Sequence, residues 1–159
     1  ASGQLHTDPD FLPATAALSG RDSGRPLLVF FEQKECAPCD ELHTDILQRP
    51  ASRDQLARLD AVLLDMWSGE AVRRPDGRTS TVTEWARELD VKYAPSLVFF
   101  DRDGREVFRS EAYLRSFHIQ SVMDYVSSGA YRDQPSFQRF IAARADALEA
   151  QGIHVDLMD

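Results

Sequence analysis

The sequence predicts an α/β fold, in which helices flank a mixed central sheet and one extra helix follows at the C-terminal end. Short apolar runs typical of buried strands alternate with stretches whose apolar residues recur at helical spacing. Two of the later runs are joined by a short glycine-containing turn, as in an antiparallel hairpin. The resulting order of strand, helix, strand, helix, hairpin and helix is typical of a domain with three layers around one core.

The elements begin after a lead-in. Residues 1–24 contain a helix-prone piece at 14–18 followed by glycine, serine and proline, and we expect them to lie outside the core. The apolar run 27–31 predicts the first buried strand. From Cys39 onward, apolar side chains at helical spacing predict a helix that Pro50 interrupts, and a second short helix follows it.

The middle of the chain predicts a second strand, two turn-linked pairs and a helix. The second strand is expected at 61–67, and the segment 70–81, with its Pro-Asp-Gly sequence, reads as a hairpin or an excursion loop. A helix should follow at about 82–89. The runs 96–101 and 105–108 flank Arg-Asp-Gly and predict the antiparallel hairpin.

The last part of the chain predicts two helices. The first has one buried stripe, formed by Ile119, Val122, Met123 and Val126. The second begins after Ser136, a residue type suited to an N-cap, and should stop before Gly152. We therefore divide the chain into a lead-in at 1–24, a main domain at 25–128 and a helical extension at 129–159 packed on that domain.

Composition limits the function classes. The chain has 159 residues and a formal net charge of −8, so a nucleic-acid backbone or an anionic membrane surface would repel it. Its apolar runs are too short to span a bilayer, and we expect no membrane insertion and a monomer. The chain begins at Ala1 without an initiator Met, which fits either removal of a signal peptide or an arbitrary boundary.

The only two cysteines lie in the string Cys36-Ala37-Pro38-Cys39, between the first strand and the first helix. A disulfide that closes so short a loop contributes little stability, because the entropic benefit of a crosslink grows with loop length. A dithiol that cycles with a disulfide explains the pair better. At a helix N-terminus Cys36 is favoured as thiolate and becomes the attacking nucleophile, and Cys39 becomes the resolving thiol.

This pair, together with the string Tyr93-Ala94-Pro95-Ser96-Leu97 before the later hairpin, resembles the thioredoxin fold over roughly residues 25–128. The residues Leu42-His43, the excursion around Asp76-Gly77 and the C-terminal extension are most similar to bacterial periplasmic thioredoxins of the SoxW type. The resemblance implies thiol-disulfide exchange without a cofactor. It also implies that Pro95 is a cis-proline facing the dithiol, and that Ala37, Pro38, Ala94 and Pro95 line the substrate groove.

The chain also departs from thioredoxins. Phe30 stands where thioredoxins carry a buried Asp, and Glu35 stands where they carry a Trp before the first cysteine. Glu32 shares a face with Phe30 if the strand extends that far, so it could replace the missing acid in proton transfer, although a solvated Glu at a strand end is the simpler interpretation. His43 lies one turn after Cys39 and is either a second proton-transfer residue or a structural histidine.

The direction of electron flow depends on how strongly the thiolate is stabilised. Glu32, Glu35, Asp40 and Glu41 place negative charge around the pair and oppose the helix dipole, which favours reducing behaviour. The alternatives are a disulfide-donating oxidase or isomerase, a Cu(I)-binding metallochaperone that uses the two thiolates, and a domain with an inert disulfide. A closed zinc site is not expected, because Cys36, Cys39 and His43 give three ligands and such sites need about four.

The same resemblance suggests a cellular setting. It implies a periplasmic protein whose signal peptide is removed before Ala1, with oxidised envelope proteins as substrates. Electrons would then come across the membrane from a CcdA- or DsbD-like thiol reductant.

Overall fold

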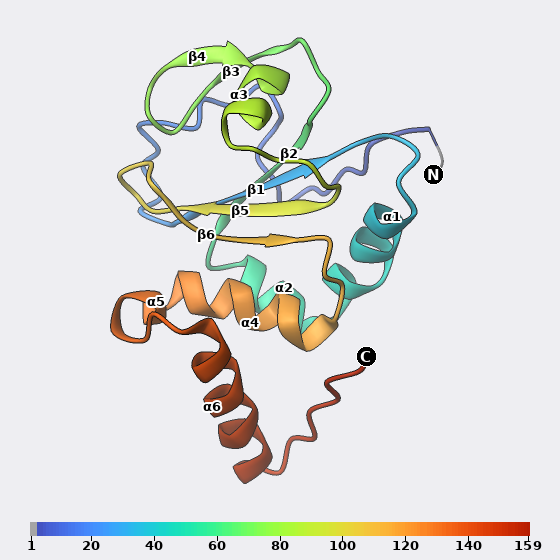
Figure 1. Ribbon diagram of the computed structural model, residues 1–159, viewed down its shortest axis with the longest axis vertical. Helices are drawn as coiled ribbons and strands as arrows, with labels where there is room; N and C mark the ends of the chain where they lie inside the picture. The colour runs from blue at the N-terminus through green and yellow to red at the C-terminus, as the bar shows by residue number, and fades with distance from the viewer. Residues whose placement is uncertain (1–2) are drawn as a thin grey trace.

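The computed structural model describes residues 3–159 and contains a four-stranded mixed sheet in the order β2-β1-β5-β6 (Figure 1). Its strands are β1 (Leu27–Glu32), β2 (Asp60–Asp65), β5 (Ser96–Phe100) and β6 (Glu106–Glu111). β1 pairs with β2 in parallel, whereas the β1–β5 and β5–β6 pairs are antiparallel. The predicted α/β fold, with its mixed sheet, flanking helices and extra C-terminal helix, is confirmed.

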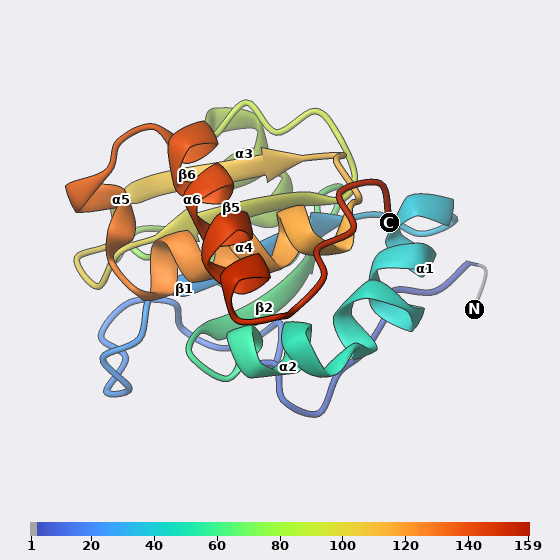
Figure 2. The same ribbon diagram turned by 90° about the horizontal axis from the view of Figure 1, so that it is seen from below.

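Helices cover both faces of the sheet (Figures 1 and 2). One face carries α1 (Ala37–Thr44), the 3₁₀ helix η1 (Ile46–Gln48), α2 (Pro50–Leu56) and α4 (Ser116–Ser127), and the other carries α3 (Val82–Glu88). Alternate residues of β1 therefore enter two separate cores: Phe30 packs with residues of α1, α2 and α4, and Phe31 packs with Trp85 of α3.

The predicted excursion at 70–81 is a small hairpin of β3 (Ala71–Arg73) and β4 (Thr79–Thr81). It lies against the turn between β5 and β6. Gly104 in that turn has a φ of +86°, and a Cβ there would come within 2.6 Å of the Pro75 carbonyl oxygen. Only glycine allows both the positive φ and this close approach.

The C-terminal extension contains α5 (Ala130–Asp133), which the sequence did not predict, and α6 (Phe137–Ala150), which it did. Ser136 caps α6 as expected, since its side chain accepts a hydrogen bond from the Arg139 amide. Phe137 is buried against Phe108 and Tyr125, with ring centroids 5.2 Å away in both cases.

The lead-in differs from expectation. The helix-prone piece at 14–18 forms turns and bends, and Leu18 is buried in the core beside α3. The Leu18 amide bonds to the Arg73 carbonyl, and Leu12 forms a parallel bridge to Val62 at the outer edge of β2. These tertiary contacts outweigh the weak local preference for helix, so the expectation that this segment lies outside the core is wrong.

Candidate active site

The two cysteines lie at the start of α1, after the loop that follows β1. Cys36 is the N-cap residue, and Pro38 sits in the first turn, where a missing amide donor is tolerated. Glu35 directly before them has a φ of +53°, in the left-handed region, and turns the chain into the helix. A disulfide joins Cys36 to Cys39, with an S–S distance of 2.08 Å and a Cα–Cα distance of 5.2 Å.

The two sulfurs have different surroundings. The backbone N–H of Cys39 donates to Cys36 Sγ over 3.2 Å, at the helix end where unpaired amides place partial positive charge. Cys36 is 6% exposed and Cys39 only 1%. After reduction, the amide and the helix terminus favour a thiolate at Cys36, so this sulfur is the better nucleophile of the pair.

The segment before β5 faces the disulfide. The Ala94–Pro95 peptide bond is cis, and the Ala94 carbonyl oxygen lies 3.7 Å from Cys36 Sγ. The Pro95 carbonyl accepts a hydrogen bond from Ala112, which follows β6. Pro95 is buried and Ala94 half-buried, whereas Ala37 and Pro38 are exposed on the first turn of α1. Of the four expected groove residues, Ala94 thus lies opposite Cys36 and is followed by the buried Pro95. Ala37 and Pro38 lie next to Cys36 on the exposed first turn of α1.

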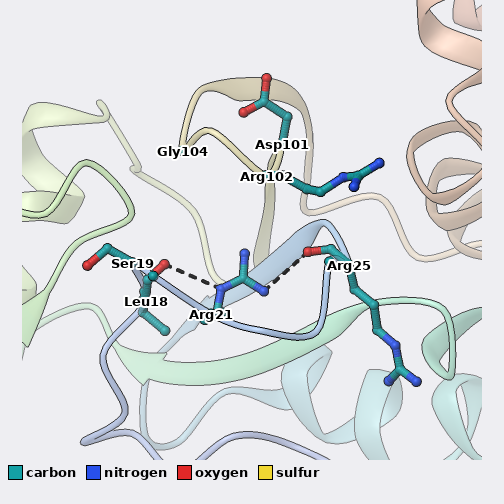
Figure 3. Close-up of a pocket in the computed structure, with 9 residues that line it drawn as sticks. Leu18, Ser19, Arg21, Arg25, Asp101, Arg102 and Gly104 are labelled. Carbon is teal, nitrogen blue, oxygen red and sulfur yellow. Dashed lines mark hydrogen bonds between the residues drawn. The ribbon is translucent and has the colours of Figure 1, made fainter.

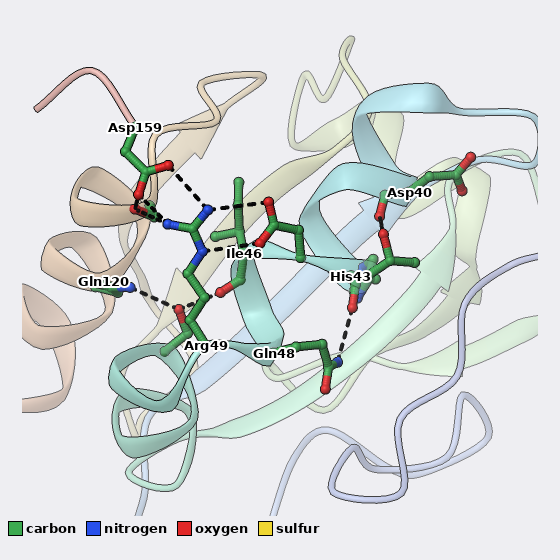
Figure 4. Close-up of polar contacts among 11 residues, drawn as sticks. Asp40, His43, Ile46, Gln48, Arg49, Gln120 and Asp159 are labelled. Carbon is green, nitrogen blue, oxygen red and sulfur yellow. Dashed lines mark hydrogen bonds and ion pairs between the residues drawn. The ribbon is translucent and has the colours of Figure 1, made fainter. Parts of the chain in front are cut away.

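Glu32 is buried, so its interpretation as a solvated strand-end residue is wrong. β1 extends through Glu32, and strand alternation turns its side chain toward α1, where Oε2 lies 2.5 Å from His43 Nε2. His43 is also buried, and the Gln48 side chain donates to its carbonyl over 2.9 Å (Figure 4). The structure therefore brings the two candidate proton-transfer residues together, one helical turn from Cys39.

His6 belongs to the same cluster, although nothing in its sequence position indicated it. Its ring stacks on His43 with the centroids 5.0 Å apart, and its Nε2 lies 2.6 Å from Asp40 Oδ1. Two of the four acids expected to crowd the cysteines are thus bound to histidines, while Glu35 and Glu41 are exposed. The expectation of four uncompensated acids is corrected to two.

A second charged contact lies beside this cluster. Arg53 of α2 donates to Asp8 over 2.8 Å and 3.3 Å. This hydrogen bond is the main reason why the pKa of Asp8 is lowered from its ordinary 3.8, and the charge of nearby His43 acts in the same direction. Asp8 is therefore held as a carboxylate within the electrostatic reach of His43.

Two exposed aromatic residues lie on segments next to the site. Trp67 follows β2, is 66% exposed and donates from Nε1 to Gln33 in the loop before Cys36 over 2.8 Å. Tyr93 precedes Ala94 and is also exposed. The sequence placed Trp67 at the end of a strand, but β2 stops at Asp65 and leaves the indole on the surface beside the site.

Elsewhere, a small cavity of about 40 Å³ lies near the start of β1, at the opposite end of that strand from the cysteines. Arg21 crosses it and donates to the carbonyls of Leu18 and Arg25 (Figure 3). Within residues 3–159 no helix is long and apolar enough to cross a bilayer.

Comparisons with known proteins place this geometry in context. The family model described as a thioredoxin-like domain matches residues 16–127. No curated protein matches the chain.

Solved structures share the fold. A thioredoxin-fold protein from Helicobacter pylori is similar with a TM-score of 0.72 at 16% identity, covering 87% of this chain and 93% of that one. Thioredoxin O2 from Arabidopsis thaliana, in its oxidised state, is similar with a TM-score of 0.53 at 20% identity, covering 77% of this chain and 98% of that one. A thioredoxin from Thermus thermophilus is similar with a TM-score of 0.50 at 23% identity, covering 70% of this chain and 81% of that one. At these identities the likeness concerns the fold.

Proposed function

Because the chain belongs to the thioredoxin-like domain family, we propose that it is a thiol-disulfide oxidoreductase that reduces disulfides in client proteins through Cys36 and Cys39. One observation carries the proposal. The Cys36–Cys39 disulfide lies on the first turn of α1, and the Ala94 carbonyl faces Cys36. A short-loop disulfide at a helix N-terminus is suited to exchange rather than to holding the chain together.

The reaction follows from the difference between the two sulfurs. In the reduced protein the Cys36 thiolate attacks one sulfur of a client disulfide, a new Cys36–client disulfide forms, and the other client sulfur leaves as a thiolate that takes up a proton. Cys39 then loses its proton and attacks Cys36 Sγ. The client leaves with two thiols, and the protein is left with the Cys36–Cys39 disulfide that the structure contains.

We assign the proton transfer of the second step to Glu32 and His43. Cys39 is 1% exposed, so bulk water is a poor acceptor for its proton. Glu32 binds His43 through Oε2, while its Oε1 is buried and has no hydrogen-bond partner within residues 3–159. A buried carboxylate with one free oxygen is suited to accept a proton from a buried thiol.

The direction and the cellular setting are parts of the same proposal. The exposed acids Glu35 and Glu41 oppose thiolate stabilisation at Cys36, which supports reduction over oxidation. We place the protein among SoxW-type periplasmic thioredoxins, with oxidised envelope proteins as clients and a CcdA- or DsbD-like membrane reductant as donor. The resemblance of the cysteine string and of the C-terminal extension supports this setting.

Two variants test the assigned roles in the full chain. Cys36→Ser should abolish reduction of a model disulfide protein such as insulin, and Cys39→Ser should accumulate mixed disulfides that dithiothreitol releases. Equal activity of both variants would overturn the roles. Stoichiometric Cu(I) binding that protects both thiols, without turnover, would instead support the metallochaperone alternative.

A further inference from the structure

The contacts of His6 connect the N-terminal segment to the candidate proton-transfer pair. Four ionisable side chains form a series in which the exposed fraction rises from 1% at Glu32 and 6% at His43 to 14% at His6 and 44% at Asp40. Each histidine binds one carboxylate, and the two imidazoles are stacked with an interplanar angle of 21°. The buried pair is thus connected by direct contacts to the more exposed His6 and Asp40.

The N-terminal segment is held firmly enough to fix His6. Asp8 and Asp10 both bind Arg53, at 2.8 Å and 2.5 Å. Phe11 stacks on Phe30 of β1 with centroids 5.3 Å apart, and the Leu12 amide bonds to the backbone of β2. The position of His6 over His43 therefore follows from several independent contacts on its C-terminal side.

Acidic and basic side chains both surround His43. Glu32 of β1 binds the His43 ring, and the charge of His43 helps to lower the pKa of Asp8. His6 binds Asp40, and when both imidazoles carry a proton the two positive rings, 5.0 Å apart, repel each other. Arg53 is nearby but is neutralised by the aspartates it binds. Within residues 3–159, His6 is thus the basic side chain that contacts the His43 ring directly.

We propose that His6 is a positioning residue of the redox site: by stacking on His43 and sharing its proton with Asp40, it keeps the Glu32–His43 pair able to accept the proton of Cys39. In the resolving step the proton moves from Cys39 to this pair, the Cys36–Cys39 bond forms, and the Cys36–client bond breaks. The pair then returns the proton to the leaving client thiolate. The N-terminal segment thereby sets the pH range in which this step is fast.

The proposal rests on the proposed function of Cys36 and Cys39, and one experiment separates the two. Reduced full-length protein is mixed with an equimolar amount of Ellman's reagent. The reagent releases one coloured thiolate when Cys36 attacks it and a second when Cys39 resolves the mixed disulfide. The two phases are followed over roughly pH 5 to 9, the range in which imidazoles titrate. The variants are His6→Gln, His6→Phe, which keeps an aromatic ring on His43, and His154→Gln as a control at an exposed histidine.

Both His6 variants remove the bond to Asp40 and the charge that an imidazole can carry beside His43, so the pH profile of the second phase should change. We expect that phase to slow about tenfold near neutral pH in both His6 variants, part of the effect typical of general bases. The rate of the first phase should be unchanged in both His6 variants, and both phases should be unchanged in His154→Gln. Full recovery of the wild-type pH profile in His6→Phe would show that only packing matters and would overturn the proposal, as would an unchanged second phase in His6→Gln. Absence of both phases in the wild type would overturn the proposed function itself.

Discussion

The segments that flank the sheet at the two ends of the chain differ in what they contact. Residues 3–24 lie along the outer edge of β2 and reach the cysteine helix through His6. Residues 129–159 pack through Phe137 on side chains of α4 and β6, and Asp159 at their end binds Arg49, which precedes α2. The first segment binds ionisable groups of the candidate site, whereas the second buries aromatic surface away from it.

This difference shows that position in the sequence does not decide the role of an added segment. Both segments lie outside the strand and helix order that defines the fold, and both bury apolar side chains. Only the N-terminal one touches groups that could titrate with the cysteines. Changes in the C-terminal segment should therefore alter stability alone, and changes in the N-terminal contacts should alter redox chemistry.

The largest stability effect is expected at the anchor of the C-terminal segment. Phe137→Ala should lower the free energy of unfolding by about 3–5 kcal/mol, because it empties a buried site between Phe108 and Tyr125. Urea denaturation measures this loss, with the exposed neighbour variant Gln138→Ala as control. The thiol-disulfide equilibrium should not change, and a clear shift in it would contradict the division of roles.

At Glu32 we expect a smaller change in the free energy of unfolding than at Phe137, together with a slower resolving step. Glu32→Gln keeps the shape of the side chain and removes the charged partner of His43. The resolving step should slow by roughly a hundredfold, at the lower end of what a general base contributes. Rapid-mixing kinetics with a small disulfide measures it, and Glu41→Gln on the exposed side of α1 is the matched control. Equal rates in the two variants would remove Glu32 from the mechanism.

The contact between Asp8 and Arg53 should give a pH-dependent effect on stability. The pKa of Asp8 is lowered in the folded protein, so the unfolded chain binds the proton more readily, and the stabilisation is present above the ordinary value of 3.8 and is lost as pH falls through the lowered value. Arg53→Gln should cost about 1 kcal/mol near pH 7. Thermal unfolding of both proteins at neutral and strongly acidic pH checks this, and a gap that persists in acid would contradict it.

The smallest effect is expected at the end of the C-terminal tail. Arg49 binds Asp45 and Asp159 and also donates to Ser116, but these groups are partly exposed and screened (Figure 4). Arg49→Ala should lower stability by about 0.5 kcal/mol and leave disulfide exchange unchanged. A loss above about 2 kcal/mol would mean that the tail contributes more to stability than its exposed ion pairs indicate.

Sequence patterns predicted several strands and turns because neighbouring residues determine these elements. Apolar runs and turn residues predicted β1 and the hairpin of β5 and β6, and they indicated either a hairpin or an excursion loop at 70–81. The spacing of Cys36 and Cys39 predicted their pairing. The burial of Glu32 depended on whether β1 continued one residue further, which periodicity does not decide. The short α5 has no room for a periodic signal.

The contacts of His6 could not be predicted for a different reason. His6 and Asp40 are 34 residues apart, and the two meet only because Phe11, Leu12 and Arg53 position the intervening chain. No spacing rule covers such a contact. The same applies to the buried Leu18, whose place depends on the β3–β4 hairpin.

The most direct test of this account is the equilibrium of the Cys36–Cys39 pair with defined glutathione or dithiothreitol buffers, read by alkylation of free thiols. We expect a reducing pair with a potential near that of thioredoxin, at about −270 mV. A potential near that of DsbA, at about −120 mV, would contradict it, because the protein would then donate disulfides rather than remove them.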